Sequence, residues 1–328
     1  MSYRFFSPAG RRAIRSVLSL LAFAAVLLPA SGQAQGTYPY PCDPSACNCP
    51  PAYTSPYTIT YTCNAASLTV GFDQSPRNNI QLESSLPYAD WYVQSNYSVG
   101  DVTWGPPPAQ YPAVAVPDDA GCSPAQWMRE RLVTTATKYI GYFYQHHHIP
   151  DWNPPADWPY NPANLGCQTA GIDCSDFSSW YYNYGLGIKL ATGVLTQSEP
   201  TTPVAGPGGV GSITPQVVAQ SVGSVPPDFN TLCGLLQTGD LLYIKGSPTG
   251  SITHVIMWIG SLGSGPDPLI IDSHGDEVVD ANGVTIPLGI HLRPFRQAEW
   301  YYTSFDHAMR FVPSGNAVAP ASMLLLPN

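Results

Sequence analysis

Charged side chains are scarce in this sequence of 328 residues, of which they make up 11%, against about 25% in an average soluble protein. Lys and Arg together number 13 and Asp and Glu 22, which leaves a net charge of −9 at pH 7. Beyond residue 15 the basic residues form no cluster, and binding to nucleic acid or to an anionic membrane surface requires one. We therefore expect no nucleic-acid partner.

The apolar run over residues 17–28 is too short to cross a bilayer comfortably, because a membrane helix needs about 20 residues. Four arginines precede it, and small residues follow at Ala30, Gly32 and Ala34. This layout predicts a secretory signal peptide over residues 1–34, with an uncleaved anchor as the alternative. We therefore expect an exported protein, periplasmic or secreted, with no integral membrane segment after cleavage and with conditions that preserve disulfides.

Residues 36–104 are rich in Pro, Tyr, Ser and Thr and contain short alternating runs, which predict short antiparallel strands. Four cysteines fall in this segment, at Cys42, Cys47, Cys49 and Cys63. In an exported segment with little apolar bulk they predict two disulfides that hold a small β module together, and three pairings are possible. Residues 105–119 are Pro-rich and predict a semi-rigid linker.

Apolar residues at helical spacing begin the next predicted unit, residues 120–313. They predict an amphipathic helix over residues 125–144, with Ser123 as its N-cap, and a second, largely buried helix over residues 174–184.

Strands are expected after these helices. A stretch of Pro, Gly, Ser and Val over residues 197–229 predicts a long loop inserted before them. Apolar or alternating runs then predict strands over residues 241–244, 254–259, 269–271 and 309–312. Helices followed by strands predict an α+β fold with an antiparallel sheet, and residues 314–328 would form a C-terminal tail.

Cys174 follows a glycine-containing turn and opens the second predicted helix. Unpaired N–H groups and the helix dipole favour an anion there, so we expect a lowered pKa and a partly ionised, nucleophilic thiol at neutral pH. Such a nucleophile needs a base and a group that orients the base. His254 begins one predicted strand and His274 ends the next, so pairing of these strands would bring both imidazoles to one sheet edge. Asp272 and Asp276 are rival orienting groups if the strand register differs by two.

Several short motifs follow one another along this unit. They are Gly-x-x-Tyr at residues 141–144, Asp-Cys-Ser at 173–175, Gly-Asp-Leu at 239–241, and His-Val with a later glycine at 254–260. In this order they resemble the NlpC-type family of cell-wall cysteine peptidases, and the resemblance covers roughly residues 123–313.

The resemblance implies a papain-like α+β domain that hydrolyses amide bonds in the stem peptides of peptidoglycan. It implies Cys174 as the nucleophile, His254 as the base and His274 as the group that holds the far nitrogen of His254. The residues expected to bind substrate are Asp173, Ser175, Asp176 and Tyr144. Asp176 departs from the family, which has a glycine there, and adds a carboxylate beside the nucleophile.

Other interpretations of these residues remain open. Cys174 is a structural half-cystine if it pairs with Cys167; if it is free, we expect one disulfide among Cys122, Cys167 and Cys233. His254 could be an ordinary core histidine and His274 a surface loop residue.

Two other functions also remain open, namely a thiol amidase or acyltransferase with a substrate outside the wall, and a catalytically idle surface-binding protein. Three consecutive histidines at residues 146–148 suggest a metal site. However, three adjacent residues do not easily converge on one tetrahedral ion, and no spaced Cys or carboxylate completes a motif nearby. We expect neither a metal nor a cofactor.

Overall fold

Six strands form the central antiparallel sheet of the computed structural model, in the order β11-β8-β7-β6-β12-β5. Their bounds are β5 Gln216–Gln220, β6 Leu241–Lys245, β7 Ile252–Gly260, β8 Leu269–His274, β11 Gly289–Pro294 and β12 Phe305–Arg310. The structure describes residues 31–32, 53–72, 110–141, 144, 172–274 and 278–312. Helices packed on this sheet confirm the predicted α+β class.

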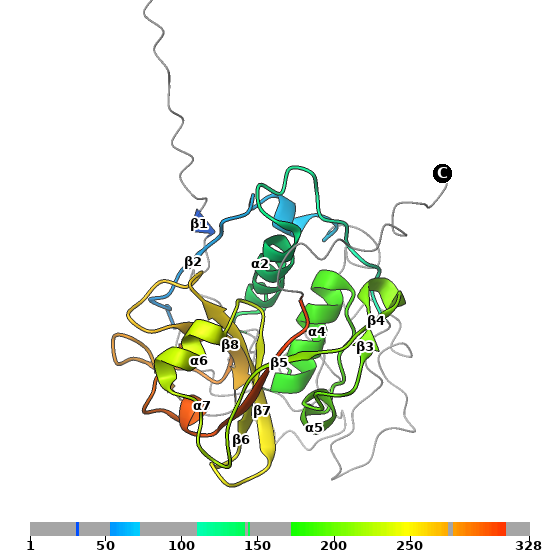
Figure 1. Cartoon of the computed structure of the whole chain (residues 1–328). Helices are drawn as coiled ribbons and strands as arrows, with labels where there is room; N and C mark the ends of the chain where they lie inside the picture. Colours follow the sequence, from blue (N-terminus) through cyan, green and yellow to red (C-terminus); the bar gives the residue numbers. More distant parts are fainter. Residues whose placement is uncertain are drawn as a thin grey trace, which may run out of the picture.

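Helices cover both faces of the sheet (Figure 1). Helices α2 (Pro124–Thr137) and α4 (Cys174–Leu186) pack together on one face, and α6 (Phe229–Leu235) and α7 (Trp300–Thr303) contribute to the core on the other. Because neither face is exposed to water, the central strands are apolar along most of their length. This arrangement places the start of α4 against β7 and β8.

The remaining elements are short. They are β1 Ser31–Gly32, β2 Ile59–Thr60, η1 Ser67–Thr69, α5 Val194–Gln197, β3 Val204–Ala205, η4 Pro207–Gly209, β4 Ser212–Ile213, β9 Val278–Val279 and β10 Thr285–Ile286. No helix in the described part of the chain combines the length and apolarity needed to span a bilayer.

The start of α2 agrees with the sequence prediction. The Ser123 side chain accepts a hydrogen bond from the Gln126 N–H at 3.2 Å, and Pro124 occupies the first turn, where its missing N–H costs nothing. The helix ends at Thr137, earlier than the predicted residue 144.

The segment of residues 53–72 packs into the same core as α2 and α4. The Glu130 carboxylate of α2, fully buried, accepts the backbone N–H groups of Thr62 and Cys63 at 3.0 and 2.9 Å. Arg131, also fully buried, donates to the carbonyls of Leu68 and Gly185 at 2.9 and 2.6 Å. One turn of α2 therefore holds this segment and the end of α4 together.

A disulfide joins Cys63 to Cys122, just before α2. The expectation that Cys63 pairs with Cys42, Cys47 or Cys49 is therefore wrong, because residues around Cys63 lie against α2 and not within a separate cluster. The expected pairing among Cys122, Cys167 and Cys233 is also wrong for Cys122, and Cys233 is a free thiol.

Removing this disulfide should destabilise the fold. Cys63 and Cys122 are 59 residues apart, so replacing both by alanine should lower the free energy of unfolding by about 2–4 kcal/mol, because the unfolded chain gains entropy. Urea unfolding of wild type and variant measures this. The matched control is Cys233→Ala, and equal unfolding midpoints for the double variant and wild type would contradict the prediction.

Residues 197–229, expected to be a loop, contain β5, which pairs with β12 at one edge of the sheet. The strand is short and only partly buried, and the Pro and Gly residues around it hide its pattern in the sequence. The predicted signal peptide other than residues 31–32, the linker before residue 110, the three histidines at 146–148 and the C-terminal tail lie outside the described residues.

Candidate active site

Cys174 is the first residue of α4, and the residue before it caps the helix. The Asp173 carboxylate accepts hydrogen bonds from the Asp176 N–H at 2.8 Å and the Ser175 hydroxyl at 3.2 Å. The turn before the helix is tied to the sheet, since the Ser273 hydroxyl of β8 donates to the Ile172 carbonyl. These contacts fix the thiol beside the sheet.

The sulfur of Cys174 is buried, with 5% of the residue exposed, and the thiol is free. The half-cystine interpretation with Cys167 is therefore wrong. The backbone N–H of Val255 on β7 lies near the sulfur and acts to lower its pKa. The thiol thus meets the strand one residue after His254.

The pKa of Cys174 is raised, whereas the sequence predicted that it would be lowered. Burial raises it well above its ordinary value, and the carboxylates of Asp173, Asp272 and Asp176 raise it further, against the opposing effect of the Val255 N–H. The helix start is therefore not enough to ionise this thiol, because desolvation and three nearby negative charges outweigh it. Cys174 is protonated at neutral pH in the resting protein.

Alkylation of Cys174 should accordingly be slow at pH 7. A free cysteine reaches its full rate above a pKa of about 8.5, whereas the rate for Cys174 should still be rising beyond pH 9. Iodoacetamide labelling at a series of pH values, read by mass spectrometry of the peptide that contains Cys174, measures this. Cys233→Ala is the background of choice, because Cys233 is the other free thiol among the described residues. An alkylation rate that reaches its plateau below pH 8 would contradict the raised pKa of Cys174.

Strands β7 and β8 bring the two predicted histidines together. The His254 and His274 ring centroids are 4.9 Å apart, and both residues are buried. Trp300 of α7 lies 5.5 Å from each of them. The sequence prediction that these imidazoles meet at one end of the sheet is borne out geometrically.

The far nitrogen of His254 is held by Asp272 and not by His274. The distance from His254 Nε2 to Asp272 Oδ2 is 2.7 Å. Asp272 lies two residues before His274 on β8, so both side chains project from the same face of the strand. Asp272 is one of the two rival orienting groups that the sequence left open.

Asp272 is itself held by two further buried side chains. Arg293 Nε on β11 donates to Oδ1 at 2.9 Å, and the Tyr301 hydroxyl on α7 donates to Oδ2 at 2.7 Å. Burial alone would raise the pKa of Asp272, but Arg293 and the His254 hydrogen bond hold it well below its usual range. Asp272 is therefore ionised at neutral pH and acts as an acceptor.

The ionised Asp272 carboxylate determines which ring nitrogen of His254 carries a proton. Because ionised Asp272 can only accept, Nε2 of His254 carries a proton, and Nδ1 is left as the acceptor in the neutral ring. His254 is thus held in one orientation and one tautomer by a buried carboxylate, as a catalytic base requires.

The Cys174 thiol and the His254 imidazole lie on opposite faces of β7. Val255 and Met257 pack in the core that contains Cys174, whereas Ile256 and Trp258, which alternate with them, pack on the other face of the sheet. By the same alternation His254 shares a face with Ile256 and Trp258, opposite the face on which the Cys174 thiol packs. Among the described residues no hydrogen bond joins the thiol to the imidazole.

The residues expected to bind substrate fall into two groups. Asp173 and Ser175 are buried and engaged in the cap of α4. Asp176, in the first turn of α4, and Tyr144 are partly exposed. Sequence reasoning missed Arg293 and Tyr301, because their strand and helix carried no recognised motif.

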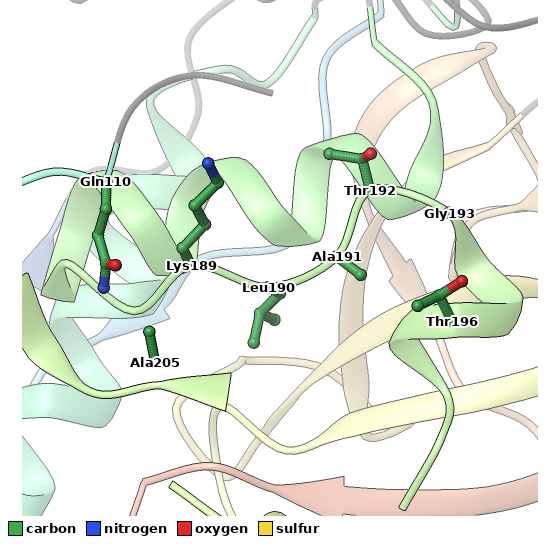
Figure 2. A pocket seen from close by; sticks show the side chains of 8 residues that line it. All are labelled: Gln110, Lys189, Leu190, Ala191, Thr192, Gly193, Thr196 and Ala205. Carbon is green, nitrogen blue, oxygen red and sulfur yellow. The ribbon is translucent and has the colours of Figure 1, made fainter. Parts of the chain in front are cut away.

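A hollow of about 460 Å³ lies beside the loop that follows α4 (Figure 2). Figure 2 shows Lys189, Thr192 and Thr196 along its wall, and the Gln110 amide crosses to the carbonyls of Gly187 and Gly206 at 2.6 and 2.8 Å. None of its lining residues belongs to the Cys174 site.

Solved structures similar to this chain include NlpC/P60 proteins. One is an NlpC/P60 family protein from Bacillus cereus ATCC 10987, with 19% identity, a TM-score of 0.30, and coverage of 56% of this chain and 40% of that chain. Another is the NlpC/p60 domain of the peptidoglycan hydrolase SagA, with 19% identity, a TM-score of 0.27 and coverage of 56% and 97%. The resuscitation promoting factor interacting protein RipA matches with 14% identity, a TM-score of 0.33 and coverage of 62% and 72%.

No protein-family model matches the sequence, and no curated protein is similar to it.

Proposed function

We propose that the protein is an exported cysteine hydrolase that cleaves amide bonds in peptidoglycan stem peptides. The observation that carries the proposal is the His254–Asp272 pair at 2.7 Å, next to the Val255 N–H that contacts the Cys174 thiol. A buried nucleophile, a base and an ionised orienting group at one strand end are the parts that covalent amide hydrolysis needs. The predicted signal peptide supports export, and the motif resemblance supports the wall as substrate.

The reaction would start with transfer of the thiol proton from Cys174 to Nδ1 of His254. The sulfur then attacks the amide carbonyl, and backbone N–H groups at the start of α4 stabilise the negative oxygen. His254 returns the proton to the leaving amine, which leaves a thioester on Cys174. Water, deprotonated by His254, hydrolyses the thioester and restores the thiol.

Because the pKa of Cys174 is raised, the resting thiol holds its proton, and proton transfer and attack are coupled. Asp272 keeps Nδ1 of His254 directed to the reaction, and His274 supports the ring from the neighbouring strand at 4.9 Å. We assign Asp173 and Ser175 to shaping the helix start, and Asp176 and Tyr144 to contacts with the stem peptide. The Asp176 carboxylate suits a positively charged amino group.

The test is digestion of purified peptidoglycan, with the products identified by mass spectrometry. The expected products carry the mass of one added water and a new amino terminus within the stem peptide. Cys233→Ala, which removes a thiol outside the site, should give the same fragments at the same rate. Intact peptidoglycan would refute the wall substrate, and rapid labelling of Cys174 by an acylating peptide probe in that case would favour a thiol amidase or acyltransferase with another substrate.

A further inference from the structure

Gln197, the last residue of α5, is a buried polar side chain that contacts the first turn of α4. Its amide Nε2 donates to the Ser175 carbonyl at 3.1 Å and to the Ala191 carbonyl at 2.6 Å. Its Oε1 accepts a hydrogen bond from the Ser178 hydroxyl at 2.8 Å. Both amide hydrogens are therefore used, and one side chain binds α5, the loop before it and the start of α4 together.

The hydrogen bonds of Gln197 require an amide at this position. A carboxylate of the same shape could accept from Ser178, but it could not donate to the two carbonyls. An apolar side chain could do neither, and the Ser175 and Ala191 carbonyls would each lose a donor in the core. Burial of an unpaired carbonyl is unfavourable, so the first turn of α4 would shift towards water without Gln197.

Cys174 lies between two carbonyls that neighbouring elements hold in place. On its N-terminal side, the Ser273 hydroxyl of β8 donates to the Ile172 carbonyl. On its C-terminal side, Gln197 of α5 donates to the Ser175 carbonyl. The position of the thiol is therefore set from both directions along the chain.

Gln197 is itself held against the sheet. Its backbone carbonyl accepts a hydrogen bond from the Tyr243 hydroxyl of β6 at 3.0 Å, and Tyr243 is fully buried. Tyr243 pairs with Val255 on β7, whose backbone N–H lies near the sulfur of Cys174. The contacts of Gln197 thus connect the start of α4 with the part of the sheet that the thiol faces.

We propose that Gln197 is a positioning residue for the Cys174 thiol. By holding the Ser175 carbonyl, it keeps the first turn of α4 against the sheet and the sulfur in its buried place beside Val255. Its effect on hydrolysis rests on the proposed function, because a displacement of about 1 Å at a reacting group can slow a reaction by about 100-fold. The place of the thiol itself can be measured without any substrate.

Gln197→Met in the full exported chain tests the proposal, since it keeps the length of the side chain and removes both donors. Water should then reach Cys174, and burial should raise its pKa less. Iodoacetamide should label Cys174 at pH 8 at least about tenfold faster than in wild type, as a pKa lower by about one implies. In peptidoglycan hydrolysis, kcat should fall by about tenfold or more, and KM should change by less than about threefold.

Ser179→Ala is the matched control. Ser179 is buried in α4, and its hydroxyl donates to the Leu190 carbonyl at 2.8 Å. This variant therefore loses a buried hydrogen bond between α4 and the same loop, but it leaves the Ser175 carbonyl untouched. It should be less stable than wild type, with the labelling rate and kcat of the folded protein unchanged.

A second variant covers the case in which Gln197→Met does not fold. Ser178→Ala removes the hydroxyl that orients the Gln197 amide and introduces the best helix former, and it should also speed the labelling of Cys174. Labelling at the wild-type rate in folded Gln197→Met, or in Ser178→Ala if the first variant is unfolded, would overturn the proposal. Equally fast labelling in Ser179→Ala would overturn it too, because a general loosening of α4 would then explain the result. If wild type leaves peptidoglycan intact, the proposed function fails, and the labelling comparison still decides the role of Gln197.

Discussion

Cys174→Ala is expected to abolish amide hydrolysis, with a fall in rate of about a thousandfold or more, to the limit of detection. The reason is chemical, because the proposed covalent intermediate forms on the sulfur of Cys174. Release of stem-peptide fragments from purified peptidoglycan, followed over time by mass spectrometry, measures the loss.

The variant should remain folded. Alanine at the first position of α4 leaves the Asp173 cap in place, and the lost volume is small, so the free energy of unfolding should fall by only about 1 kcal/mol. Cys174→Ser should be equally inactive, since a hydroxyl is a far weaker acid than a thiol. Hydrolysis by folded Cys174→Ala at the wild-type rate would remove Cys174 from the mechanism.

Asp272→Asn is expected to damage both stability and activity. Arg293 is fully buried and its charge is balanced by Asp272 at 2.9 Å; with an amide in that place the guanidinium keeps its charge in the core without compensation. Breaking one partner of such a pair typically costs about 3–5 kcal/mol. The same change lets the imidazole adopt the wrong tautomer, which should lower the rate of hydrolysis by about 10²–10⁴-fold.

Denaturant unfolding at several pH values measures the effect on stability, and the rate of hydrolysis by the folded variant measures the effect on activity. Folding lowers the pKa of Asp272, so its contribution is present above the unfolded carboxyl pKa of about 4 and is lost as the pH falls towards the folded pKa. Between pH 5 and 2, Asp272→Asn should therefore lose stability less steeply than wild type. Asp118→Asn, at an exposed position in the turn before α2, is the matched control and should change neither property. Wild-type activity in Asp272→Asn would exclude Asp272 as the orienting group.

The fold class was accessible from the sequence because it depends on local pattern. The apolar runs that became β6, β7 and β8, and the Ser123 cap of α2, are visible in the order of residues alone. Pairing over long distances is not. Cys63 pairs with Cys122 because Glu130 and Arg131 hold residues 53–72 against α2 by hydrogen bonds. No sequence pattern near Cys63 predicts that contact.

The sequence pointed to the residues of the candidate site, but it did not predict the protonation state of the thiol. Cys174, His254 and His274 could be chosen because nucleophiles and bases are few and their positions at element ends are readable. The pKa of Cys174 could not be predicted, since it depends on burial and on Asp272, a carboxylate contributed by β8 almost a hundred residues later. Arg293 and Tyr301 entered the site only through the three-dimensional path of β11 and α7.

The position of β12 has a consequence for the order in which the molecule matures. This strand, the last of the described chain, is an interior strand, with β6 on one side and β5 on the other. A chain synthesised from its N-terminus has the Cys174 helix well before it has His254, Asp272 and Arg293, and β5 has no partner until β12 arrives. In the proposed mechanism the nascent protein therefore carries its thiol before the base is present, and the site is complete only after Arg293 and Tyr301 have been made.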